Sequence, residues 1–239
     1  MQTRTTTFAI QRGADRSFAD HGWLKTYHSF SFADYHDPAN LQWGALRVFN
    51  EDFIAAGRGF PEHPHRDMEI LTYVLEGELE HQDSMGNRGV VGPGCVQYMS
   101  AGTGIRHAEV NHSDEHGLHI VQMWLLPSKP NLAPAYGQRE FSTDDRRGHW
   151  LLVASGRAEL RAPIAVNQDA AFFVSKLEHE EIRHPFAADR LGFLFVADGD
   201  VVANAQRLKG GDAVRIAATP ELTVSGAGEV LLWDLPPAA

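Results

Sequence analysis

The chain consists of many short apolar segments separated by glycine and proline. Residues 69–76 and 118–126 are strand-like, and turn residues such as Pro93-Gly94 and Gly210-Gly211 fall between such segments. Short strands at a spacing of roughly 8–12 residues, broken by such turns, are typical of β-sandwiches and β-barrels. No stretch keeps a 3.6-residue apolar period over three helical turns. The sequence therefore predicts an all-β protein.

The same pattern of short strand-like segments and turns occurs in both halves of the chain. Residues 127–148, rich in proline and charge, separate the two halves. Gly210-Gly211-Asp212 precedes a strand-like segment in the second half, as Pro93-Gly94 does in the first. We therefore expect two tandem barrels, an N-terminal domain over residues 1–134 and a C-terminal domain over residues 135–239.

Two pairs of potential metal ligands stand out in the first half. His63 and His65 are separated by one residue, and so are His107 and Glu109. In extended backbone, side chains two residues apart point to the same face. Three imidazoles and one carboxylate, presented two by two from separate strands, suit a divalent transition metal. The spacing therefore predicts a metal site made by these four residues.

The competing interpretation is chance, because the chain has 13 histidines. A typical unpaired histidine is a surface residue or a hydrogen-bonded core residue. His179 and His184 are interpreted in that way, as part of a solvated face, because no second pair matches them and they flank a Glu-rich segment. We accordingly expect the second barrel to lack a metal site.

Composition restricts the partners and the compartment. A formal net charge of −10 argues against direct binding to nucleic acid or to an anionic membrane. The single cysteine, Cys95, offers neither an internal disulfide nor a thiolate zinc cluster. The first residues lack the apolar core of a signal peptide, and no apolar run approaches the ~20 residues that span a bilayer. We expect a cytoplasmic protein, and a monomer whose two barrels cover each other.

These motifs resemble those of the pirin family of bicupins, which includes bacterial quercetin 2,3-dioxygenase-like proteins. The first cupin motif, G-x5-H-x-H-x3-E, is present as Gly57, His63, His65 and Glu69. Its following glycine, Gly77, comes one residue later than usual.

The second cupin motif runs from Gly104 to Asn111 and contains His107 and Glu109, with Gly102 where a proline is expected. Pirin-like strings cover residues 21–34, 63–70 and 100–109. The resemblance is dense from about residue 15 to 140 and looser beyond. It implies two tandem cupin barrels of the jelly-roll type, of which only the first binds metal.

The resemblance also bears on the choice of carboxylate ligand. Cupins commonly take it from the first motif, which would be Glu69, whereas pirins take it from the second. That implies Glu109 here, in agreement with the strand spacing. Glu69 would then lie on the same side as His63 and His65 if the strand is unbroken, close to the metal without binding it.

A pirin of this kind is expected to be a mononuclear metal-dependent dioxygenase that acts on quercetin-like flavonols with O2. Glu109 would be both metal ligand and general base. Fe(II) is the expected metal, while Ni, Co, Mn, Cu and Zn also suit imidazole and carboxylate ligands. The expected substrate is a small aromatic molecule in a pocket lined by aromatic side chains of the first half.

Two other functions stay open on the sequence alone. Pirins are also described as non-catalytic, iron-binding redox sensors that bind a transcription-related protein, and the net charge permits such a protein partner. Cupins further include metal-assisted isomerases and hydrolases, because a fold does not fix a function.

Overall fold

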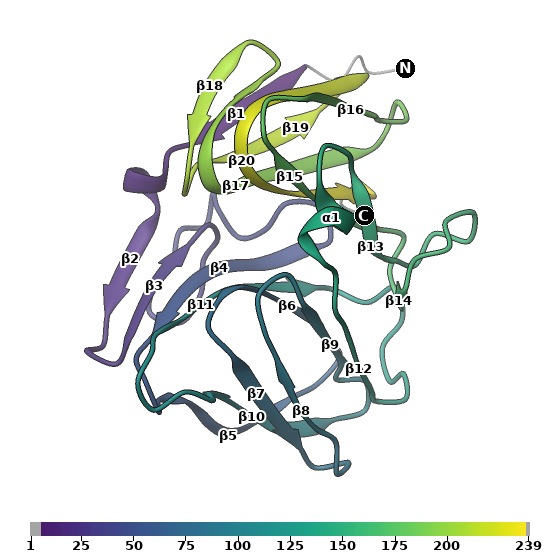
Figure 1. Ribbon diagram of the computed structural model, residues 1–239. Coiled ribbons are helices and arrows are strands. Elements are labelled where there is room, and N and C mark those ends of the chain that lie inside the picture. Colours follow the sequence, from purple (N-terminus) through teal and green to yellow (C-terminus); the bar gives the residue numbers. More distant parts are fainter. Residues whose placement is uncertain (1–5, 238–239) are drawn as a thin grey trace.

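The computed structural model describes residues 6–237, and its regular structure is almost entirely β (Figure 1). Helix within these residues is limited to a 3-10 turn, η1 (Gly13–Asp15), and one turn of α-helix, α1 (Thr143–Arg146). The prediction of an all-β protein is confirmed. None of the described helices is long and apolar enough to cross a membrane.

Two antiparallel sheets form the first barrel. The larger sheet has the spatial order β12-β9-β6-β11-β4-β3-β2, and the smaller one has the order β5-β10-β7-β8. The strands of the larger sheet are β2 (Ser17–Asp20), β3 (Leu24–His28), β4 (Leu46–Ile54), β6 (Glu69–Glu76), β9 (Val96–Ser100), β11 (Leu118–Leu125) and β12 (Ala135–Arg139). The strands of the smaller sheet are β5 (Gly59–His65), β7 (Leu79–Asp83), β8 (Arg88–Val91) and β10 (Ile105–Asn111).

A nine-stranded sheet forms the second barrel. Its main path is β1-β19-β17-β20-β15-β13-β14, with β16 beside β20 and β18 beside β17. The strands are β1 (Thr7–Gln11), β13 (Leu151–Ser155), β14 (Ile164–Ala165), β15 (Ala171–Leu177), β16 (Glu181–Pro185), β17 (Leu191–Ala203), β18 (Gln206–Lys209), β19 (Ala213–Ala217) and β20 (Glu221–Leu235).

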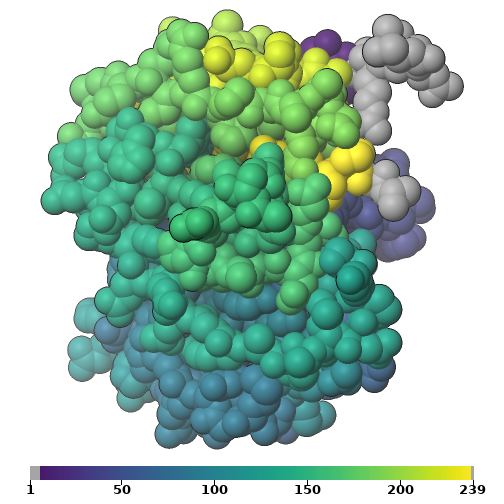
Figure 2. Space-filling view, turned by 90° about the vertical axis from the view of Figure 1, so that its right-hand side faces the viewer, coloured from purple at the N-terminus to yellow at the C-terminus, as the bar shows by residue number. Residues whose placement is uncertain are grey.

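Two strands lie across the division expected between residues 134 and 135. β1, near the start of the chain, pairs with β19 of the second barrel. β12 follows residue 134 directly and pairs with β9 of the first barrel. In the space-filling view, the purple atoms of the N-terminal segment accordingly lie with the green and yellow upper half (Figure 2). The division at residues 134 and 135 remains a prediction.

One apolar core joins the two barrels. The sheet of β4, β11, β6 and β9 lies between the smaller sheet and the second barrel (Figure 1). Phe49 packs against Phe193 and Phe195 of the second barrel, with ring centroids 4.8 and 4.9 Å apart. Trp233 donates its indole N–H to the sulfur of Met123 at 3.1 Å. Burial of each such large side chain contributes roughly 1.5–3 kcal/mol to the free energy of folding.

A buried polar cluster also crosses this junction. Arg146, in the short helix between the barrels, donates to the carboxylate of Glu229 on β20 and to the Tyr73 hydroxyl on β6. The Tyr73 hydroxyl in turn donates to Glu229. Burial raises the pKa of Tyr73 well above its usual value, and the Glu229 charge adds to this effect. The cluster therefore needs all three members, because each one satisfies another away from water.

Replacing Glu229 should destabilise the protein strongly. Glu229→Ala leaves the Arg146 guanidinium buried without a carboxylate, which should cost about 3–5 kcal/mol of unfolding free energy in urea denaturation. The double variant Arg146→Met/Glu229→Ala should recover part of this loss, because it removes the unpaired charge. Arg183→Ala, at an exposed ion pair on β16, is the control and should change little. Equal losses in the single and double variants would contradict this account.

Candidate metal centre

Strands β5 and β10 bring three histidines together. In their antiparallel register His107 lies directly opposite His63, and Ile105 lies opposite His65. A β-bulge between His107 and Glu109 shifts the register beyond that point. Because β5 and β10 are both extended, His63 and His65 share one face, and His107 meets them from the neighbouring strand.

The ring nitrogens of these histidines face one another. His63 Nε2 lies 3.1 Å from His107 Nε2, and the ligand atoms of His63, His65 and His107 lie within 4.8 Å of one another. His63 Nδ1 lies 2.8 Å from the carbonyl of Pro61, a contact that places the proton on Nδ1 and leaves Nε2 with its lone pair. His65 Nε2 is buried and has no hydrogen-bond partner among the described residues. Ring nitrogens that converge in this way from three histidines fit a metal cation.

The protein keeps two of these imidazoles neutral. Burial and, to a lesser extent, the neighbouring imidazoles lower the pKa of His65 to about 4 and that of His107 to about 3. Both side chains are therefore unprotonated at neutral pH, which is the form that binds metal.

Glu109 reaches the same cavity from β10 and is almost fully buried. Gln97 donates to its Oε1 at 2.8 Å, and Gln122 donates to its Oε2 at 2.7 Å. A carboxylate offers about four lone-pair positions, so the two amides fix Glu109 and leave acceptor capacity. The potential ligands grouped most closely with Glu109 are His81 and His107. Three of the four predicted ligands, His63, His65 and Glu109, thus line one cavity. His107 is not part of its lining, but it belongs to both groups of potential ligands.

His81 was missed by the sequence analysis. It lies on β7, with Nδ1 3.5 Å from His107 Nδ1 and Nε2 3.2 Å from Asp83 Oδ2. Its ring also stacks on Tyr136 at 4.4 Å. The sequence does carry a signal for it, because His81 and Asp83 have the same two-residue spacing as the other pairs. A histidine held in this way orients its neighbour His107.

Glu69 does not lie beside the histidines. The strand breaks after His65, and Asp67 adopts a left-handed conformation with φ of 48°. Glu69 therefore starts β6 in the other sheet, where its carboxylate accepts from Tyr98, Ser100 and the backbone N–H of Asn167. The strand is therefore not continuous from His63 to Glu69, and the prediction that Glu69 lies close to the metal is wrong. Its role is to bind the second barrel.

The cavity in front of the histidines has a volume of about 390 Å³ and aromatic walls. Trp124 lies edge-on to His65, with ring centroids 4.8 Å apart, and edge-on to Phe32 at 5.4 Å. Phe60 lines the cavity beside Pro61. Such walls suit a flat aromatic ligand.

A larger hollow of about 610 Å³ opens beside Trp23, Phe53 and His119. None of His63, His65, His107 and Glu109 lines it. We place the chemistry in the smaller cavity, because the potential ligands converge there.

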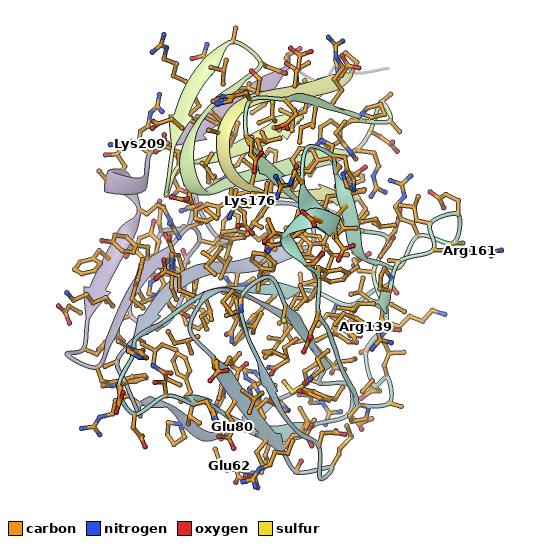
Figure 3. All side chains as sticks on the ribbon, in the orientation of Figure 1. Glu62, Glu80, Arg139, Arg161, Lys176 and Lys209 are labelled. Carbon is orange, nitrogen blue, oxygen red and sulfur yellow. The ribbon has the colours of Figure 1, made fainter. Side chains whose placement is uncertain are left out.

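The opposite face of the smaller sheet carries charge instead of ligands. Glu62, next to His63, accepts from Arg106 at 2.8 Å. Glu80, next to His81, accepts from His112 at 2.9 Å. Both glutamates lie at the outer end of the first barrel (Figure 3). Charged residues on the outer face thus alternate with histidines on the inner face, as expected for a sheet that has one face in solvent.

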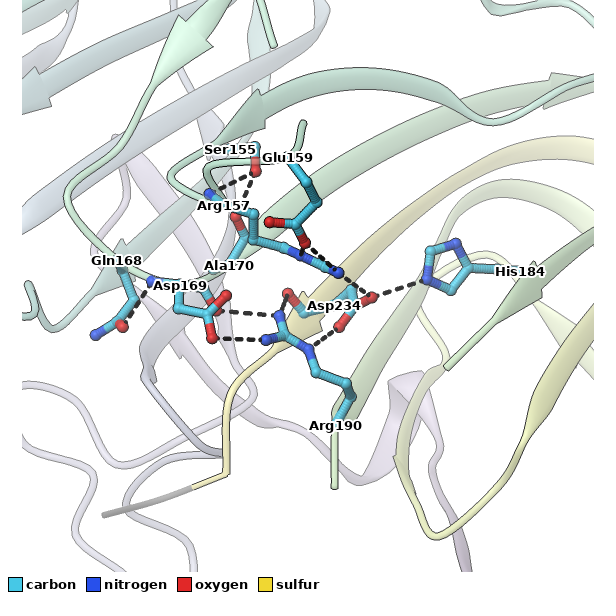
Figure 4. Close-up of polar contacts among 9 residues, drawn as sticks. All are labelled: Ser155, Arg157, Glu159, Gln168, Asp169, Ala170, His184, Arg190 and Asp234. Atoms are coloured by element: carbon cyan, nitrogen blue, oxygen red, sulfur yellow. Dashed lines mark hydrogen bonds and ion pairs between the residues drawn. The ribbon is translucent and has the colours of Figure 1, made fainter. Parts of the chain in front are cut away.

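The second barrel uses its buried histidine differently (Figure 4). His184 is buried, and its Nε2 lies 3.1 Å from Asp234 Oδ2, so the prediction that it belongs to a solvated face is wrong; His179 is exposed as expected. Arg190 and Arg157 also bind Asp234. Among residues 6–237, two groups of three potential metal ligands are found, and both lie in the first barrel.

Asp52 should make stability depend on pH. It lines the cavity, and burial raises its pKa to about 7. The folded protein therefore holds a proton that the unfolded chain releases near pH 4, so this stabilisation is lost as pH rises from about 4 through 7. In urea denaturation of the metal-free protein, the stability of Asp52→Asn relative to wild type should rise between pH 5 and pH 8 by about 3 kcal/mol. A difference that stays constant with pH would contradict the prediction.

The comparisons with known proteins agree with the two-barrel architecture. A family model described as pirin matches residues 11–125, and one described as the quercetinase C-terminal cupin domain matches residues 152–235. The quercetin 2,3-dioxygenase of Escherichia coli (strain K12) is 42% identical over 231 residues, which are 95% of this chain and 98% of that protein. A pirin-like protein of Caulobacter vibrioides is 44% identical over 219 residues, which are 90% of this chain and 94% of that protein.

A solved structure gives the same result in three dimensions. The crystal structure of the bacterial pirin YhhW in complex with nickel(II), from Escherichia coli, has a TM-score of 0.90 at 42% identity and covers 97% of this chain and 100% of that one. The predicted bicupin fold is confirmed. The chain belongs to the pirin family.

Proposed function

We propose that this pirin is a mononuclear metal-dependent dioxygenase that acts on quercetin-like flavonols with O2. The observation that carries the proposal is the convergence of His63, His65 and His107 at an aromatic-walled cavity that the first two of them line. The name of the Escherichia coli relative, quercetin 2,3-dioxygenase, supports the reaction class. The nickel(II) complex of YhhW supports a divalent metal.

His63, His65, His107 and Glu109 are the proposed ligands of that metal. Three neutral imidazoles and one carboxylate leave a +2 ion with one net positive charge and with free coordination positions. When bound, the metal supplies Lewis acidity, which favours the deprotonated form of a substrate hydroxyl. Fe(II) remains our first choice on ligand type, and Ni(II) is the ion that the YhhW structure contains.

The chain's own residues supply orientation and a base. Gln97 and Gln122 hold the Glu109 carboxylate in place, so that it can accept the proton of the substrate hydroxyl at a fixed position. Trp124, Phe32 and Phe60 hold the aromatic rings and exclude water from the cavity. Glu109 is accordingly the proposed catalytic base.

Metal content should depend on the histidines of the cavity. Purified wild-type protein should contain about one metal per chain, and His63→Ala should lose it, because two imidazoles hold a divalent ion far more weakly than three. His81→Ala should keep the metal with about 10–100-fold weaker affinity, since it acts through His107. His116→Ala, at an exposed histidine, is the control. Loss of metal in His81→Ala equal to that in His63→Ala would reassign His81 as a ligand.

Oxygen uptake should depend on Glu109. After anaerobic loading with Fe(II), wild-type protein should consume O2 on addition of quercetin in an oxygen electrode. Glu109→Gln should slow this uptake by about 10²–10⁴-fold, the usual contribution of a general base, while metal analysis shows the ion still bound. Bound metal without uptake, for every metal and flavonol tried, would favour the non-catalytic regulator that binds a protein partner.

A further inference from the structure

A row of polar side chains crosses the larger sheet beneath the cavity. The residues lie directly opposite one another on five neighbouring strands, and all are buried. Along the row they are Gln97, Thr72, Gln122, Asn50 and His28. Side chains that are direct cross-strand neighbours share one face of the sheet. The row therefore forms a continuous polar stripe inside the first barrel.

At one end of this row, the side chains contact Glu109 on the facing sheet. Gln97 and Gln122 donate their amide N–H groups to its two oxygens, and the Thr72 hydroxyl lies 3.4 Å from one of them. Gln122 also accepts from the indole N–H of Trp124 at 3.0 Å. These three members of the row therefore hold a catalytic side chain and an aromatic wall.

The other end of the row has no such partner. Asn50 Oδ1 and His28 Nδ1 are buried and make no hydrogen bond within the described chain, and the same is true of Oδ1 of Asp52, two residues beyond Asn50. Asn50, His28 and Asp52 are each at least nine-tenths buried, and all three line the 390 Å³ cavity with His63 and His65. A buried polar atom without a partner destabilises the folded protein, so three of them lining one cavity wall indicate a bound group that satisfies them.

The geometry points to a hydrogen-bonding subsite, made by Asn50, His28 and Asp52, for the hydroxyl-bearing ring of an aromatic ligand. The inference rests on the proposed function, since the subsite would bind the ring of the same flavonol that lies away from the metal. Neighbouring strands are about 4.8 Å apart, so Asn50 stands roughly 5 Å and His28 roughly 10 Å from Gln122 along the row. A fused or linked second ring spans this interval while the first ring stays at the metal.

The oxygens of Asn50 and Asp52 define the chemistry of the ligand. An amide oxygen accepts hydrogen bonds, and a phenolic hydroxyl donates one. A site built to bind a hydroxyl rejects the analogue that lacks it, because its own buried groups then stay unpaired. The subsite therefore selects polyhydroxylated aromatic ligands over those with a single hydroxyl at the metal.

The test compares two ligands that share the hydroxyl next to the carbonyl. Quercetin carries further hydroxyls on both ring systems, whereas 3-hydroxyflavone carries none. Their dissociation constants would be measured by fluorescence quenching with Ni(II)-loaded protein under argon, so that turnover does not contribute. Asn50→Leu keeps the approximate size of the side chain and removes its polar atoms. Gln11→Leu is the matched control, because Gln11 also has a buried, unpartnered amide oxygen but lies outside the cavity.

Wild-type protein should bind quercetin at least tenfold more tightly than 3-hydroxyflavone. Asn50→Leu should weaken quercetin binding about five- to tenfold and change 3-hydroxyflavone binding by less than about twofold, because only quercetin loses a hydrogen bond. Its melting temperature should be equal to or above that of wild type, since an unpaired buried polar group has been removed. His28→Leu, one strand further along the row, should show the same pattern and serves if Asn50→Leu does not fold.

The outcomes separate the subsite from the function on which it rests. Wild-type protein that binds neither flavonol overturns the proposed function, and the subsite with it. Wild-type protein that binds both equally, or a variant in which both affinities fall together, overturns the subsite alone. A loss of discrimination in Gln11→Leu would also overturn it, because that side chain cannot touch the ligand.

Discussion

The larger sheet of the first barrel is buried on both faces, and the site depends on this double burial. Leu71 and Tyr73 point toward the second barrel and join the shared apolar core, while Thr72 between them points toward Glu109. The same alternation holds around Gln97 and Gln122. A shift of one residue in any of these strands would put a polar side chain into the core between the barrels. The apolar packing therefore fixes the register on which the polar row depends.

The two sheets of the first barrel supply different parts of the site. The smaller sheet carries the histidines on its inner face, and the larger sheet carries the neutral amides that hold Glu109. The second barrel contributes support, because the backbone N–H of Asn167 binds Glu69 at 2.9 Å, directly after the turn that follows His65. The second barrel thus supports the turn beside the histidines, although none of its described residues lines the cavity.

The sequence predicted features within single strands better than contacts between residues that are far apart in the chain. Period-two spacing predicted that His63 and His65 lie together on one strand and that His107 and Glu109 lie together on another, because the spacing within a strand is a local property. The polar row could not be predicted, since it depends on which strands are neighbours and in which register. Burial of His184 was missed for the same reason, because its partner Asp234 lies 50 residues away. The break at Asp67 carried only a weak local signal, the tolerance of aspartate for the left-handed conformation.

Two buried carboxylates, one in each barrel, have partners of different charge, and this difference favours the first barrel as the place for a cation. Asp234 in the second barrel is bound by two guanidinium groups and by His184, and these partners lower its pKa although burial raises it. Its charge is already compensated, and a cation placed there would be repelled by the arginines. Glu109 is held by the uncharged amides of Gln97 and Gln122 instead. These amides fix its position without compensating its charge, and the uncompensated charge is what a divalent cation requires.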